Sequence, residues 1–101
     1  MGSGLDATAI QRTVRRYSPA VRQNCWLRAL DARPAGVPAS AKLTATITVE
    51  AGGRVQGVSV SGAPRGYPSL SRCVENAVKG WQFPRSGTQT VTNVPFMFVG
   101  Q

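Results

Sequence analysis

One stretch of this chain alternates so strictly that it sets the fold class. From Lys42 to Glu50, apolar residues occupy every second position, and threonines and charged residues stand between them. Because successive side chains of a β-strand point to opposite faces, this period of two predicts a strand with one buried and one solvated face. The apolar set is Leu43, Ala45, Ile47 and Val49. A half-buried strand of this kind is typical of an antiparallel sheet covered on one side.

A hairpin is expected directly after this strand. Ala51–Arg54 contains two glycines and predicts a short connection, and Val55–Ser61 predicts the returning strand. Val55 is out of phase with the apolar pair Val58 and Val60, which predicts a β-bulge near Gly57.

Two other parts of the chain have helical character. Asp6–Asp31 is predicted to be helical, with Thr8 as its N-terminal cap and a bend near Ser18, where Pro19 starts a second segment. Ser69 is predicted to cap a helix from Leu70 to Lys79. Its apolar residues recur at helical spacing, as Leu70, Cys73, Val74, Ala77, Val78 and Trp81.

The last predicted strand runs from Gln89 to Val99 and contains Pro95. Proline cannot donate a ladder hydrogen bond, so this strand should lie at an edge of the sheet. The chain therefore predicts a two-layer α+β domain: a three-stranded antiparallel sheet of order 2-1-3, covered on one face by helices. We take residues 1–4, Met-Gly-Ser-Gly, as a cloning remnant and residues 5–101 as one domain.

The residues that most enzymes need are scarce. The chain has no histidine, and its four carboxylates, at Asp6, Asp31, Glu50 and Glu75, are far apart in sequence. Two cysteines without histidine do not complete a zinc site, and a nucleophilic cysteine would lack its usual base. We therefore expect no enzymatic activity, no metal and no cofactor.

The charge points to an anionic partner. Twelve Lys and Arg against four Asp and Glu give a formal charge of +8. Nucleic acid, an anionic membrane or cell-wall surface, and an acidic protein all remain open on this ground. The basic residues are spread along the chain, whereas nucleic-acid-binding proteins more often cluster them with aromatic residues.

The two cysteines, Cys25 and Cys73, each fall on or near the apolar face of a predicted helix. If both helices pack on the same side of the sheet, the thiols can meet in a disulfide. Two buried and reduced cysteines are an equally good interpretation of the residues alone.

Taken together, these stretches resemble the TonB C-terminal domain superfamily, and more closely the AgmX/PglI-type C-terminal domains of gliding-motility proteins. The similarity extends from about Leu5 to Val99. The matching segments are Ile10–Tyr17 with Asn24-Cys25-Trp26, Ala45–Glu50 with Gly53-Arg54-Val55, Val58–Gly62, Leu70–Val74 with the Trp81–Pro84 exit, and Val94–Phe98. Trp26 stands where tyrosine is more usual, and plain TonB proteins usually lack the cysteine pair.

The resemblance implies a function as well as a fold. It implies a Cys25–Cys73 disulfide and a periplasmic location at the C-terminus of an inner-membrane-anchored, proton-motive-force-coupled protein. Such a domain grips a periplasmic or outer-membrane partner by edge-strand addition, here within the motility machinery rather than in iron uptake.

The expected partner-binding edge is the last strand, where Val94, Phe96 and Phe98 should be core and Val91, Asn93 and Met97 should face outward. Its residues are Val91, Thr92, Asn93, Val94, Pro95, Phe96, Met97 and Phe98. Two alternatives stay open: the edge merely ends the sheet, with Pro95 protecting it against aggregation, or the domain forms a homodimer by strand exchange. A basic cell-wall or membrane-surface anchor and, third, a nucleic-acid binder are the rival functions.

Overall fold

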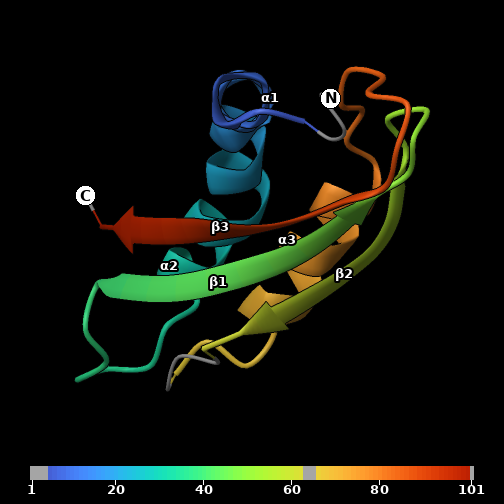
Figure 1. Ribbon diagram of the computed structural model, residues 1–101. Coiled ribbons are helices and arrows are strands. Elements are labelled where there is room, and N and C mark those ends of the chain that lie inside the picture. The colour runs from blue at the N-terminus through green and yellow to red at the C-terminus, as the bar shows by residue number, and fades with distance from the viewer. Residues whose placement is uncertain (1–4, 63–65, 101) are drawn as a thin grey trace.

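The computed structural model describes residues 5–62 and 66–100 of the chain (Figure 1). Residues 1–4, which we took as a cloning remnant, lie outside this range, as do residues 63–65. In the described residues the order of elements is α1 (Ala7–Val21), a π-helical turn (Arg22–Trp26), α2 (Leu27–Asp31), β1 (Ser40–Val49), β2 (Val55–Ser61), α3 (Leu70–Lys79) and β3 (Thr90–Val99). The fold is α+β, as predicted.

The sheet is antiparallel and has the expected order β2-β1-β3. β1 pairs with β3 without interruption, from Ser40 opposite Val99 to Val49 opposite Thr90. Its pairing with β2 shifts between Thr48 and Val49, next to Gly57, and this confirms the predicted bulge.

The alternation in β1 has the predicted structural effect. Leu43, Ala45, Ile47 and Val49 are at most 1% exposed. Residues Leu70, Val74 and Val78 of α3 are buried in the same cluster, and α3 packs against β2. Burying each large apolar side chain contributes about 1.5–3 kcal/mol, so this layer between α3 and the sheet holds the domain together.

Trp26 joins the end of the first helical region to the same core. It is fully buried and stacks on Phe98, with ring centroids 5.4 Å apart and planes 10° apart. Tyr67 packs against its other side at 5.1 Å. Trp26 therefore fixes the π-helical turn over the far end of β3.

Helix α1 corrects two of our predictions. Its N-terminal cap is Asp6, whose carboxylate accepts a hydrogen bond from the Ala9 N–H, and not Thr8. The helix continues through Ser18 and Pro19 without the expected break. The hydroxyl of Ser18 donates to the Val14 carbonyl one turn earlier instead of capping a new helix. Burial of Val21, just beyond the proline, offsets the missing backbone donor.

The irregularity that we expected near Ser18 occurs three residues later, as the π-helical turn. The Leu27 N–H donates to the Arg22 carbonyl, five residues back. This spacing lets Val21 and Trp26, which are also five apart, face the same core. In a regular α-helix these two side chains would diverge by well over a quarter of a turn.

Helix α3 has the predicted bounds, Leu70–Lys79, and Ser69 is its N-terminal cap residue. The Ser69 side chain makes no capping hydrogen bond, however, so the predicted hydroxyl cap is absent. The carbonyl of Ser69 accepts the Cys73 N–H as the first bond of the helix.

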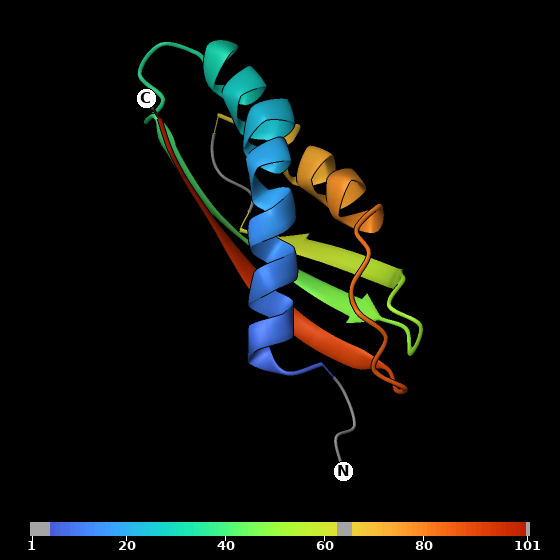
Figure 2. The same cartoon turned by 90° about the horizontal axis from the view of Figure 1, so that it is seen from above.

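The helices do not cover the sheet in the simple way that we expected. α3 lies on one face, but α1 crosses above β3 at the border of the sheet, as the view from above shows (Figure 2). Two hydrogen bonds place α1 along this strand. The Leu5 N–H donates to the Thr90 hydroxyl, and the Arg22 guanidinium donates to the Val99 carbonyl. The residues that flank α1 are thus tied to the two ends of β3.

Candidate functional site

β3 is the longer and more regular of the two edge strands. Its ten residues pair with β1 in unbroken register. β2 has seven residues, carries the bulge, and is preceded by Arg54, which bridges to Gln82. Short strands and bulges protect an edge from pairing with another chain. By this criterion β2 is the protected edge, and β3 is the one suited to accept a strand.

The main-chain groups of β3 alternate between β1 and the open edge. Pro95 has no N–H, and the Val99 carbonyl accepts a hydrogen bond from Arg22 of the π-helical turn. The N–H of Gly100 donates to the carbonyl of Ala39, just before β1. The even-numbered residues of β3 therefore point their main-chain groups toward β1. Since the N–H and C=O of one strand residue point to the same edge, odd-numbered residues of β3 turn theirs outward. The N–H groups of Val91, Asn93, Met97 and Val99 therefore point to the open edge, and no backbone partner for them is found among residues 5–62 and 66–100.

The side chains of β3 follow the predicted division. Val94, Phe96 and Phe98 are 4–5% exposed and belong to the core. Val91, Met97 and Val99 are 61%, 70% and 62% exposed, and Asn93 and Pro95 are exposed as well. The opposite residues of β1 on this outer face are Lys42, the threonines and Ser40. Exposed apolar area on the outer face therefore gathers on the edge strand.

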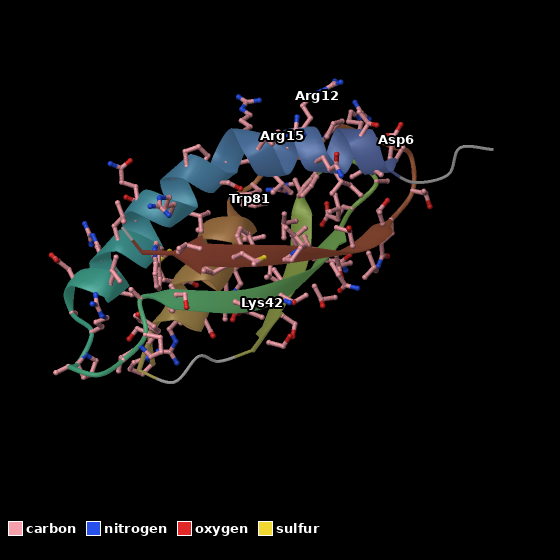
Figure 3. The ribbon with its side chains drawn as sticks, turned by 90° about the vertical axis from the view of Figure 1, so that its left-hand side faces the viewer. Asp6, Arg12, Arg15, Lys42 and Trp81 are labelled. Atoms are coloured by element: carbon pink, nitrogen blue, oxygen red, sulfur yellow. A yellow bond between two sulfur atoms is a disulfide. The ribbon has the colours of Figure 1, made fainter. Side chains whose placement is uncertain are left out.

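A groove separates α1 from β3, and sequence reasoning did not anticipate it. Its first part, about 440 Å³, lies between the start of α1 and Thr92–Pro95. Its second part, about 510 Å³, lies between the end of α1 and Pro95–Phe98. Arg15 and Pro95 line both parts, so the two parts meet and together border residues 92–98 of β3. Figure 3 shows α1 along β3, with Arg12 and Arg15 on the helix.

The flank of α1 that borders the groove is mixed, because Ala7, Ile10, Val14 and Pro19 line it together with polar and basic residues. Gln11, Arg15, Ser18 and Arg22 line it at intervals of four, three and four residues, which is the spacing of one helix face. Within residues 5–62 and 66–100, the ion pair found is Lys79–Glu75, on α3. No carboxylate of the described chain thus neutralises Arg15 or Arg22. The spacing was visible in the sequence, but its direction depends on where α1 packs.

The predicted disulfide is present. Cys25, in the π-helical turn, is bonded to Cys73 of α3, with Cα atoms 5.6 Å apart. The bond joins segments that are 48 positions apart in sequence. It anchors the base of α1 to the helix that covers the sheet.

The described part of the chain holds no group of three or more His, Cys, Asp or Glu residues placed to bind a metal ion. None of its helices is both long and apolar enough to cross a membrane.

Comparison with known proteins assigns no family. The chain matches no protein-family model and no curated protein.

Proposed function

We propose that this domain is a partner-binding module of the TonB C-terminal type, which grips an extended segment of another protein through the open edge of β3. The observation that carries the proposal is the unpaired row of main-chain groups on β3, beside its exposed Val91, Met97 and Val99. An edge strand of this kind is a template for a strand from another chain.

The chemistry of such binding is simple. A partner strand accepts hydrogen bonds from the outward N–H groups of Val91, Asn93 and Met97 and donates to the outward carbonyls. Pro95 supplies only a carbonyl, so the contact has one donor fewer near its centre. Main-chain bonds hold the partner, and alternate side chains select it. No catalytic step, metal or cofactor takes part.

The cellular setting is part of the proposal. The Cys25–Cys73 disulfide favours an oxidising compartment, and the periplasm is the one we propose. There the domain would be the C-terminal end of an inner-membrane-anchored, proton-motive-force-coupled protein of the gliding-motility machinery. Its partner would be a periplasmic or outer-membrane protein of that machinery. The disulfide would hold the base of α1 in place when force arrives from the N-terminal side.

The test is a selection of random peptides displayed on phage against the purified domain, followed by binding measurements on two variants. Met97→Pro removes one outward donor at a site where no ladder bond to β1 is lost. Met97→Ala removes the side chain and keeps the donor. We expect selected peptides to lose at least about fivefold in affinity with Met97→Pro, since one hydrogen bond is worth about 1 kcal/mol.

The peptide affinities of the two variants, compared with each other, decide whether the Met97 N–H takes part in binding. Equal affinities for Met97→Pro and Met97→Ala, with both proteins folded by circular dichroism, would contradict strand addition at this edge. So would selected peptides that bind only on α3.

A basic surface anchor is the second candidate, and one observation favours it. Arg12, Arg15 and Arg16 are all exposed, and their spacing places them on one face of α1. A row of this kind suits anionic lipid or cell-wall polymer. Cosedimentation with phosphatidylglycerol vesicles at physiological salt, lost in the triple glutamine variant of these arginines, would favour the anchor over the partner-binding module.

A further inference from the structure

We propose that the groove between α1 and β3 selects an extended segment of a partner protein in which acidic and apolar residues alternate. The inference rests on the proposed function, because it names the kind of strand that the edge of β3 receives. It follows from the two different surfaces that border this edge, one with two arginines and one apolar.

The geometry of strand pairing divides the side chains of an added strand between these surfaces. Residues directly opposite each other in two paired strands point to the same face. Partner residues opposite Val94, Phe96 and Phe98 therefore point toward the helical side, where α1 lies. Partner residues opposite Met97 and Val99 point to the outer face of the sheet.

The helical side of the groove calls for acidic side chains. Arg15 and Arg22 both line the part of the groove that Pro95–Phe98 borders, and Arg22 also donates to the Val99 carbonyl at its end. Both arginines are exposed, and neither has a carboxylate among the described residues to neutralise it. Ser18, between the two arginines in sequence, and Gln11, one turn before Arg15, also line the groove with polar side chains. Glutamate or aspartate opposite Phe96 and Phe98 would come within reach of the two guanidinium groups.

Arg16 is a less suitable partner for the incoming strand. Its guanidinium lies 5.6 Å from the centre of the Tyr17 ring, in a cation–π contact. Tyr17 itself stacks on Trp81, with centroids 5.2 Å apart. Arg16 thus stays over the aromatic pair, and the selective charges at the edge are those of Arg15 and Arg22.

The outer face calls for apolar side chains. Met97 and Val99 are exposed by more than half and sit opposite Lys42 and Ser40 of β1. A valine or another β-branched residue opposite each of them would bury this area in a cross-strand pair. Acidic residues toward α1 and apolar residues toward the outer face thus alternate along the partner strand, because successive side chains of a strand point to opposite faces.

A second copy of this chain fits the groove poorly. β3 contains no charged residue, so it cannot satisfy Arg15 and Arg22 of a neighbour. The chain also carries a formal charge of +8, and edge-to-edge pairing would bring two basic α1 helices together. Charge complementarity therefore favours an acidic partner over self-association.

The test uses short capped peptides and NMR titration, which reports affinity and location together. The first peptide alternates valine with glutamate, the second valine with glutamine, and the third valine with lysine. A fourth has the composition of the first in two blocks, without alternation. We expect the alternating glutamate peptide to bind at the β3 edge about two- to thirtyfold more tightly than the glutamine peptide, the range that two exposed ion pairs give.

Two charge-reversed variants provide the matched comparison. Arg15→Glu with Arg22→Glu should lose the preference for glutamate and gain one for the lysine peptide. Arg72→Glu with Arg85→Glu changes the net charge equally, away from the groove, and should keep the glutamate preference. Both pairs of arginines are exposed, so both variants should fold.

The outcomes separate this inference from the proposed function. Equal binding of the glutamate and glutamine peptides at β3 would overturn the charge selection and leave strand addition standing. Binding of the block peptide as tight as that of the alternating one would overturn the alternating pattern. Failure of every alternating peptide to shift the β3 amides would overturn both proposals.

Discussion

The Nη1 atom of Arg22 lies 3.3 Å from the carbonyl oxygen of Val99 and donates a hydrogen bond to it across 77 residues of chain. This contact closes the far end of the β3 edge, and Leu5 bonded to Thr90 closes the near end. α1 therefore borders the edge at both ends, and the groove lies between. A partner strand that pairs along β3 must displace the Arg22 contact or stop short of Val99.

The first prediction concerns this bordering helix. Gln11 and Asn93 are exposed and line the same part of the groove, from α1 and β3 respectively. If both are changed to cysteine and joined by a short bismaleimide, α1 is tied to the edge strand. We expect the joined protein to lose binding of an edge-selected peptide, because the linker spans the groove that the added strand would enter.

The single cysteine variants, capped with N-ethylmaleimide, are the control for the modification itself, and the cross-linked protein should bind more weakly than either of them. The native cysteines are paired in a disulfide, so they do not react. Unchanged affinity in the cross-linked protein would mean that the partner does not enter between α1 and β3.

The alternation of β3 predicts unequal costs for neighbouring substitutions. Phe96 is 5% exposed, and Phe96→Ala should lower the free energy of unfolding by about 3–5 kcal/mol. Met97 is 70% exposed, and Met97→Ala should change it by no more than about 0.5 kcal/mol. Urea unfolding measures both. Similar costs for the two would contradict the assignment of the faces.

The disulfide should make a large contribution to a domain of this size. Closing the loop between Cys25 and Cys73 restricts the unfolded chain by about 4 kcal/mol in the chain-entropy model. The total stability of a small domain is about 5–15 kcal/mol. We expect the free energy of unfolding of the double variant Cys25→Ala with Cys73→Ala, measured by chemical denaturation, to be lower by most of the about 4 kcal/mol that the disulfide contributes. A loss below about 1 kcal/mol would contradict this account.

Two adjacent glycines in the β1–β2 hairpin should differ sharply. Gly53 has φ +99°, and a Cβ placed there would collide with the Phe83 carbonyl. Gly53→Ala should therefore destabilise the domain by at least about 2 kcal/mol. Gly52 has open space around it, so Gly52→Ala should be nearly neutral. Thermal melting of both variants makes the comparison, and equal melting temperatures would contradict the hairpin geometry.

Sequence reasoning succeeded where local pattern and tertiary packing agree. The period of two in β1, the phase shift at Gly57 and the apolar stripe of α3 predicted the strands, the bulge and one helix. Pro95 predicted the edge position of β3, because the missing donor is a property of the residue itself.

It failed where packing overrides local preference. Ser18 and Pro19 favour a new helix start, yet burial of Val21 and Trp26 carries the helix past them. The π-helical turn leaves no local signal except the five-residue spacing of these two side chains. The pair of arginines along the groove was missed for a related reason. Arg15 and Arg22 become a site only because α1 crosses β3, and this crossing depends on long-range contacts.

The central claim is that the odd-numbered residues of β3 present unpaired donors which a partner strand takes up. Amide hydrogen exchange by NMR tests it most directly, first on the free domain and then with an edge-selected peptide bound. The account predicts fast exchange at Val91, Asn93 and Met97 in the free domain and slow exchange at Thr92, Val94, Phe96 and Phe98. It further predicts that the peptide slows the first group. Slow exchange at the odd-numbered residues without peptide, or no change at them in the complex, would contradict it.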